Sequence, residues 1–153
     1  MMEYDIYIRV LAAVLLGFVI GLEREYSNKY AGLRTHILVC LGACVFTIIS
    51  IHGFPVLAGT TSRDTARVAA QIVTGIGFIG GGTVLRHGET VIGLTTAATL
   101  WIAAAIGMAC GAGMYDLAIA SSLLSVIVLV CVRIFEKNVL KKHVNDAHKC
   151  EDC

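Results

Sequence analysis

The feature that most constrains this chain is a glycine-rich, apolar run without charged residues at 72–85. Asp64 and Arg67 precede this run and Arg86 follows it. The stretch 66–85 has the length of about 20 residues that a helix needs to cross a hydrocarbon layer about 30 Å thick. Because the run has no polar face, it is unlike the core of a soluble protein. We therefore predict a membrane-spanning helix at 66–85.

Four more stretches have the same character, each ended by charges or turn residues: 6–22, 36–51, 93–113 and 115–135. The composition agrees, because 57% of the residues are hydrophobic, 15% are charged and the mean hydropathy is +0.79. We predict an all-α membrane protein, a compact bundle of five transmembrane helices over 1–135. A short tail containing Cys and His follows at 136–153.

The distribution of basic residues predicts the orientation, because cytoplasmic loops of membrane proteins are enriched in Lys and Arg. Five spans place the two termini on opposite sides of the membrane. With a cytoplasmic C-terminus, nine of the twelve basic residues lie inside, and only Arg9, Arg63 and Arg67 lie outside. We predict an N-outside, C-inside chain with a cytoplasmic tail.

Glycine spacing predicts how the helices associate, since lipid supplies no hydrophobic force between them and small residues permit close backbone approach. Glycines four residues apart occur in three of the predicted helices, as Gly17 and Gly21, Gly77 and Gly81, and Gly107 and Gly111. Glycine is also frequent in membrane helices for no specific reason, and that alternative stays open. Trp101 lies near the middle of its span, so we expect it to pack within the bundle.

The run from Gly75 to Gly80 matches the GxGxxG pattern of dinucleotide-binding folds. That motif requires a preceding strand and an acidic residue about 20 positions later, where Thr95 stands instead. We reject nucleotide binding. Three consecutive glycines, Gly80, Gly81 and Gly82, lower the helix propensity of this span. The helix is therefore either broken there or packed closely under a neighbour.

Polar residues gather at the cytoplasmic rim of the first two spans: Glu23, Arg24, Glu25, Arg34, Thr35 and His36. One interpretation is that these residues end the helices at the lipid headgroups. The other is a partly desolvated ion pair between Glu23 and Arg34, which would hold the two helices together. We favour the structural ion pair.

A second polar group is predicted near the outer side. Asp64, Arg67 and Gln71 share one helix face by their spacing, and Arg67 lies one turn into the membrane. Arg67 either extends to the membrane surface or faces a polar pocket. We expect a pocket between helices, to which the fourth span contributes Thr95, Thr96 and Thr99.

The remaining chemistry in the chain is sparse. The tail contains His143, His148, Cys150 and Cys153, whose spacing matches no standard zinc site and gives a weak metal-binding candidate. The chain contains no nucleophile paired with a base, no metalloprotease motif and no phosphate-binding loop. We expect neither an enzyme nor a cofactor nor nucleic-acid binding.

Four separated segments carry a family resemblance: GLERE at 21–25, AGLRTH at 31–36, AAQIVTGIGFIGGG at 69–82 and GLTTAATLW at 93–101. Together, and in this order, they resemble the MgtC/SapB family of bacterial inner-membrane proteins. The resemblance covers most of the first 115 residues. It implies a five-helix domain in the inner membrane, linked to magnesium homeostasis, to adaptation to low magnesium and, in pathogens, to survival inside host phagocytes.

The resemblance also implies partners, because some members regulate other membrane machinery such as the ATP synthase and magnesium-transport ATPases. Many members carry a soluble C-terminal domain. Only the short segment 136–153 follows the last span here, so functions of that domain are not transferred. We expect a regulator that lies in the lipid bilayer and binds another membrane protein. We also expect that the chain can form homo-oligomers. The alternative is a small transporter or channel for magnesium, although no Asp or Glu lies in the middle of a span to coordinate it.

Overall fold

The computed structural model describes residues 2–53, 66–88 and 90–151. It contains five α-helices: α1 (Met2–Tyr26), α2 (Leu33–Ile48), α3 (Ala66–Gly82), α4 (Leu94–Gly111) and α5 (Tyr115–Glu151). A π-helical turn, η1 (Ile49–Gly53), continues α2. Between α3 and α4 the chain forms a short antiparallel hairpin of β1 (Leu85–His87) and β2 (Thr90–Ile92). The prediction of an all-α protein is thus confirmed, apart from this hairpin.

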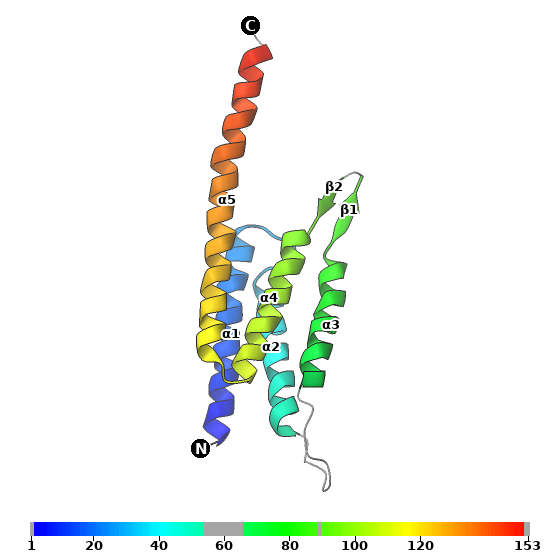
Figure 1. The fold of residues 1–153 in the computed structure, drawn as a ribbon, viewed down its shortest axis with the longest axis vertical. Helices are drawn as coiled ribbons and strands as arrows, with labels where there is room; N and C mark the ends of the chain where they lie inside the picture. The colour runs from blue at the N-terminus through cyan, green and yellow to red at the C-terminus, as the bar shows by residue number, and fades with distance from the viewer. Residues whose placement is uncertain (1, 54–65, 89, 152–153) are drawn as a thin grey trace.

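The helices run alternately in opposite directions along the long axis of the molecule (Figure 1). Helix α2 packs against both α1 and α4, and α5 packs against α4 and α1. Helix α3 lies at the edge of the bundle and packs mainly against α4. We call the end at which α1 finishes and α2 and α4 begin the hairpin end, and the end at which α1 begins and α4 finishes the opposite end.

Glycines of α1 and α4 allow both helices to approach the backbone of α2. A Cβ atom at Gly107 would lie 2.1 Å from the Cys40 carbonyl oxygen, and one at Gly111 would lie 2.6 Å from the Cys44 carbonyl oxygen. On the other side of α2, a Cβ atom at Gly17 would lie 2.9 Å from Cβ of Cys40. Gly21 is equally close to Leu33. The three helices α1, α2 and α4 therefore form the tightly packed centre of the bundle.

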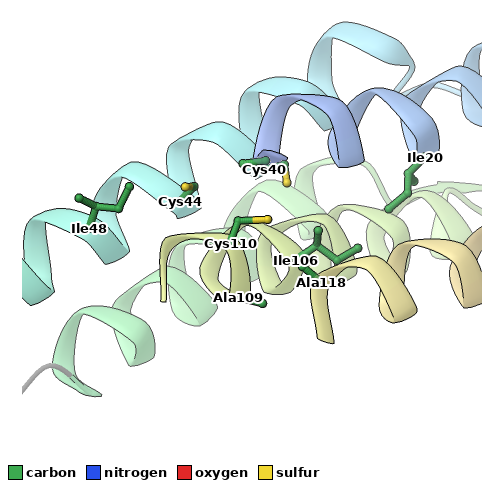
Figure 2. Close-up of a cluster of buried hydrophobic side chains, with 9 residues drawn as sticks. Ile20, Cys40, Cys44, Ile48, Ile106, Ala109, Cys110 and Ala118 are labelled. Atoms are coloured by element: carbon green, nitrogen blue, oxygen red, sulfur yellow. The ribbon is translucent and has the colours of Figure 1, made fainter. Parts of the chain in front are cut away.

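Small and branched side chains fill the space between these helices. Figure 2 shows the larger cluster, in which residues of α1, α2, α4 and α5 converge. Cys40, Cys44 and Cys110 are buried in it as free thiols. A second cluster joins α2, α3 and α4 around Leu100. The interior between the two ends is thus mostly apolar, and the hydroxyl of Ser122 in α5 is a buried polar group within it.

The third helix differs most from the sequence prediction. It ends at Gly82 rather than at Leu85, so the consecutive glycines terminate the helix. A Cβ atom at Gly75, Gly77 or Gly81 would meet no atom within 4 Å, and only Gly80 touches a neighbour, Ala97 of α4. The expectation that these glycines pack helices within the chain is therefore wrong for all but Gly80, because α3 lies at the edge of the bundle.

Trp101 is also placed differently from the prediction. Its side chain is 52% exposed on the outer face of α4, because the tightly packed face of that helix carries alanines and glycines instead. An indole ring is too large for the interhelical distances that those small residues set. The prediction that Trp101 packs in the interior is wrong for the described part of the chain.

Four of the described helical segments are long and apolar enough to cross a membrane: Tyr4–Tyr26, Leu33–Gly53, Leu94–Gly111 and Tyr115–Asn138. Helix α3 has 17 residues, at the lower limit for a span. Helix α5 continues from its apolar part to Glu151 without interruption, so no break in the helix marks the boundary predicted at residue 135.

Candidate functional site

A buried arginine marks the hairpin end of the bundle. Arg24, near the end of α1, is only 2% exposed. Its Nη2 donates to the Thr96 hydroxyl of α4 at 3.4 Å, and its Nη1 lies 3.6 Å from Oε2 of Glu23. A buried guanidinium is stable only with such partners, since removal of its hydration shell is costly. Arg24 therefore ties α1 to α4 through polar contacts.

His36 extends this group of polar contacts into α2. Its Nδ1 lies 2.8 Å from the Gly32 carbonyl oxygen and its Nε2 lies 3.1 Å from the Thr99 hydroxyl. Because a carbonyl oxygen only accepts, Nδ1 carries the proton in the neutral ring, and Nε2 faces the Thr99 hydroxyl. Thr99 also lies 2.9 Å from the Thr96 carbonyl oxygen. His36 thus joins α2 to the same turn of α4 that Arg24 contacts.

Glu23, on the other side of Arg24, accepts a hydrogen bond from Ser27, which in turn contacts Arg133 of α5. The Ser27 hydroxyl donates to Oε1 of Glu23 at 2.7 Å, and Arg133 of α5 donates to the same hydroxyl at 2.5 Å. We call the whole group the hairpin-end cluster: Glu23, Arg24, Ser27, His36, Thr96, Thr99 and Arg133. It links four helices by polar contacts.

The hairpin-end cluster is incompletely satisfied. Oε2 of Glu23 and Nε of Arg24 are buried and have no hydrogen-bond partner among the described residues. A cavity of about 560 Å³ adjoins them, and its walls include both residues as well as Ser27, Arg133 and Thr95. Unsatisfied buried polar atoms are uncommon in proteins, and a bound water, ion or ligand in the adjoining cavity would account for them.

The opposite end holds a second polar group, which is fully engaged. Arg9 of α1 donates to Oδ2 of Asp5 through both Nε and Nη2, at 2.9 and 2.5 Å. Its Nη1 donates to the Gly111 carbonyl oxygen at 2.7 Å, where the C-terminus of α4 carries partial negative charge. Tyr115 of α5 lies 3.4 Å from Oδ1 of Asp5. This opposite-end cluster braces α1, α4 and α5.

The structure combines the predicted site residues differently from the sequence prediction. Thr96 and Thr99 meet Arg24 and His36 at the hairpin end, whereas Arg67 and Gln71 lie exposed in the first turns of α3 at the other end. The prediction of one pocket that contains both sets of residues is therefore wrong, because α3 and α4 run in opposite directions. Asp64 lies outside the described residues.

The predicted Glu23–Arg34 pair is also replaced. Glu23 faces Arg24 and Ser27, while Arg34 is exposed at the start of α2. Glu25 has a role that was not predicted: its Oε2 accepts from the backbone N–H of Leu33 at 3.0 Å and so caps α2. Arg34 and Thr35 instead line one end of a groove between α2 and α3.

This groove has a volume of about 650 Å³ and apolar walls, with Gln71 in one wall. Its small residues include Gly42 of α2 and Gly75 of α3, where an added Cβ atom would meet nothing within 4 Å. The groove exists because α3 packs mainly against α4 and leaves the adjacent face of α2 largely uncovered. We call it the α2/α3 groove.

Sequence reasoning missed four residues of the two polar clusters, namely Ser27, Arg133, Asp5 and Arg9. No spacing pattern connects them, since the contact between Arg133 and Ser27 joins residues 106 positions apart. The only available signal was a charged residue inside a predicted span, which holds for Arg9 and Arg133.

The weak metal-binding candidates are not placed by the structure. The backbone of α5 continues through His143, His148 and Cys150, but their side chains, like Cys153, lie outside what the structure describes. Among the described residues, no three His, Cys, Asp or Glu side chains gather where they could hold a metal ion.

Comparison with known proteins places the chain among membrane proteins. Residues 10–138 match the model of the MgtC family. The chain is 44% identical over 130 residues to the putative magnesium transporter YhiD of Escherichia coli K12, covering 84% of this chain and 60% of that protein. It is 43% identical over 143 residues to protein MgtC of Salmonella typhimurium LT2, covering 93% and 57%. The chain therefore spans less than two thirds of the length of these curated relatives, and no solved structure matches it.

Proposed function

The chain belongs to the MgtC family of membrane proteins, and from this we propose that it supports magnesium homeostasis and adaptation to low magnesium by binding and modulating another membrane protein. In this proposal it is non-enzymatic and lies in the bacterial inner membrane. Its partner is an ion-transporting membrane protein, such as an ion-transport ATPase or the ATP synthase.

The observation that carries this proposal is the apolar interior between the two polar ends. Ile20, Cys40, Leu100 and Ile106 are fully buried or nearly so in the clusters that separate Arg24 from Arg9. Magnesium requires hard oxygen ligands and keeps several waters, and an ion path needs polar groups along its length. In the described interior the hydroxyl of Ser122 is an isolated polar group and no carboxylate lies near it, which favours a binding role over conduction through one copy.

We place the partner in the α2/α3 groove. The groove is apolar and is open along two helices, and a partner's transmembrane helix meets these requirements because its apolar side chains would fill the space. Gly42 and Gly75 on its two walls would allow the close backbone approach that drives helix association in lipid. Arg34 at one end of the groove supplies a positive charge for an acidic residue at the end of the partner helix.

Substitution of Gly75 tests this assignment. Because an added Cβ at this position meets no described atom within 4 Å, Gly75→Leu should fold normally but obstruct the groove. We expect it to abolish rescue of low-magnesium growth in a bacterial strain that lacks its own family member. Protein level and melting temperature in detergent should match those of the unmodified chain.

Gly77→Leu is the matched control, because Gly77 lies on the same helix, is equally free of contacts and does not line the groove. It should retain rescue. Gly107→Leu shows what a folding defect looks like, since its Cβ atom would lie 2.1 Å from the Cys40 carbonyl oxygen. Full rescue by Gly75→Leu, or equal loss in Gly75→Leu and Gly77→Leu, would contradict docking in the groove.

The alternative is transport of magnesium, which the printed name of the Escherichia coli relative supports. Magnesium uptake by proteoliposomes containing the purified chain distinguishes the two functions. We expect uptake equal to that of empty liposomes. Uptake above that level, if it is lost in Thr95→Val, would show transport instead of modulation, because Thr95 is an exposed residue beside the hairpin-end cavity.

A further inference from the structure

The cavity at the hairpin end has an unusual combination of walls. Four basic side chains and two acidic ones border it, together with an apolar strip from α5: Glu23, Arg24, Ser27, Lys29, Thr95, Val128, Leu129, Val132, Arg133, Glu136 and Lys137. The basic residues outnumber the acidic ones, so the cavity attracts anions. Its volume of about 560 Å³ is sufficient for a small organic group.

Arg24 borders this cavity and has an unused donor beside it. Its side chain is 3% exposed, and Nε lacks an acceptor among the described residues although Nη2 contacts Thr96. Arginine has five N–H donors in a rigid plane that matches the oxygens of phosphate and carboxylate groups. A buried donor without an acceptor is unfavourable, so an anion at this position would satisfy it.

The acidic residues in the wall do not make this a cation site. Oε1 of Glu23 accepts from Ser27, and Oε2 of Glu23 lies beside Arg24, so the charge of this carboxylate is balanced within the protein. Glu136 lies on the exposed side of α5. A metal ion at the centre of the cavity would be repelled by Arg24 and Arg133.

The apolar strip indicates what kind of anion binds. Val128 and Val132 are exposed, Leu129 is partly buried, and all three lie on α5 within the last turns of its apolar part. The exposed faces of Val128 and Val132 are not covered by other described residues, so in a bilayer they face lipid. The basic residues follow directly, at Arg133 and Lys137. This order from apolar to basic matches a phospholipid, whose acyl chains adjoin an anionic headgroup.

We propose that the hairpin-end cavity binds an anionic phospholipid. Its phosphate group lies between the guanidinium groups of Arg24 and Arg133, and its acyl chains lie along Val128 and Val132. The lipid closes the unsatisfied side of the cluster that joins α1, α2, α4 and α5. This inference goes beyond the proposed function and is independent of it, because lipid binding would occur whether or not a partner occupies the α2/α3 groove.

The test is retention of lipid by the purified full chain in detergent, measured by native mass spectrometry. Phosphatidylglycerol and phosphatidylcholine are supplied at equal concentration, and we expect preferential retention of phosphatidylglycerol. Arg133→Gln should lower that retention about fivefold, the effect of one basic residue at an anionic membrane surface. Arg34→Gln removes the same charge at the same end but outside the cavity, and should retain the lipid.

Several results would overturn the proposal. Equal retention of the two lipids would show that the headgroup charge is not recognised, and equal loss in the two variants would show a general charge effect. If millimolar inorganic phosphate displaced phosphatidylglycerol completely, the site would bind a free phosphate rather than a lipid. Melting temperatures of both variants close to that of the unmodified chain ensure that lost retention does not reflect unfolding.

Discussion

The two ends of the bundle each hold an arginine of α1 among polar partners, but they differ in how fully those partners satisfy it. At the opposite end Arg9 uses Nε, Nη1 and Nη2 on Asp5 and on the carbonyl oxygen of Gly111. At the hairpin end Arg24 is more deeply buried, yet its Nε has no acceptor among the described residues. A cavity adjoins Arg24.

This difference separates a structural brace from a site. Hydrogen bonds to charged groups stabilise a fold when each nitrogen of the guanidinium has an acceptor, as around Arg9. Around Arg24 the protein leaves a donor and an acceptor unmatched inside a low-dielectric region, which is unfavourable without a further partner. Substitutions at the two ends can therefore test the comparison through stability as well as binding.

The largest effect is expected for Arg24→Leu. It removes the charge that balances Glu23 in a buried position, and loss of one partner of a buried pair costs about 3 kcal/mol or more. The free energy of unfolding, measured by titration of the detergent-solubilised protein with denaturant, should fall by this amount. The double variant Glu23→Gln, Arg24→Met should recover most of the loss, and no recovery would mean that Arg24 acts through packing alone.

Arg9→Met should have the next largest effect, a decrease of about 2 kcal/mol in the free energy of unfolding. Three hydrogen bonds disappear, but Asp5 is 45% exposed and can be hydrated. Arg9→Lys should restore part of the stability through a single contact. A decrease as large as that for Arg24→Leu would remove the distinction between the two ends.

Thr99→Val tests the contact between α2 and α4 at the hairpin end. Loss of the hydroxyl leaves Nε2 of His36 without its partner at a fully buried position, which should cost about 1 kcal/mol. Thr95→Val, on the exposed side of α4, should change stability by less than about 0.5 kcal/mol. Thermal unfolding of the two variants side by side measures the difference, and equal shifts would argue against the His36 contact.

Tyr115→Phe should have the smallest effect, within about 0.5 kcal/mol. Its hydroxyl lies 3.4 Å from Oδ1 of Asp5, a long hydrogen bond at a partly exposed position. The melting temperature should therefore remain close to that of the unmodified chain. A large decrease would show that the opposite end depends on this residue and not mainly on Arg9.

Much of the fold is predictable from local sequence. The apolar stretches locate α1, α2, α4 and α5, because about 20 apolar residues between polar ones have few structures available other than a membrane helix. The spacing of Gly17 and Gly21 in α1, and of Gly107 and Gly111 in α4, identifies the helix faces that approach α2. A glycine permits a short interhelical distance because it has no side chain.

The same signal misleads in α3. Gly77 and Gly81 have the same spacing, but no described atom lies within 4 Å of a Cβ at either position. Spacing indicates that a helix can be approached closely and does not identify what approaches it. The hairpin between α3 and α4 also escaped prediction, because its two strands have only three residues each.

The sequence by itself determined the class of the protein, the approximate limits of its helices and its resemblance to the MgtC family, since these depend on hydrophobicity and on local motifs. Only the tertiary structure decided which polar residues meet. Arg24 contacts Thr96 across 72 positions and Arg133 contacts Ser27 across 106. Such contacts depend on the direction and rotation of whole helices, which the packing of the complete bundle sets and which no local pattern encodes.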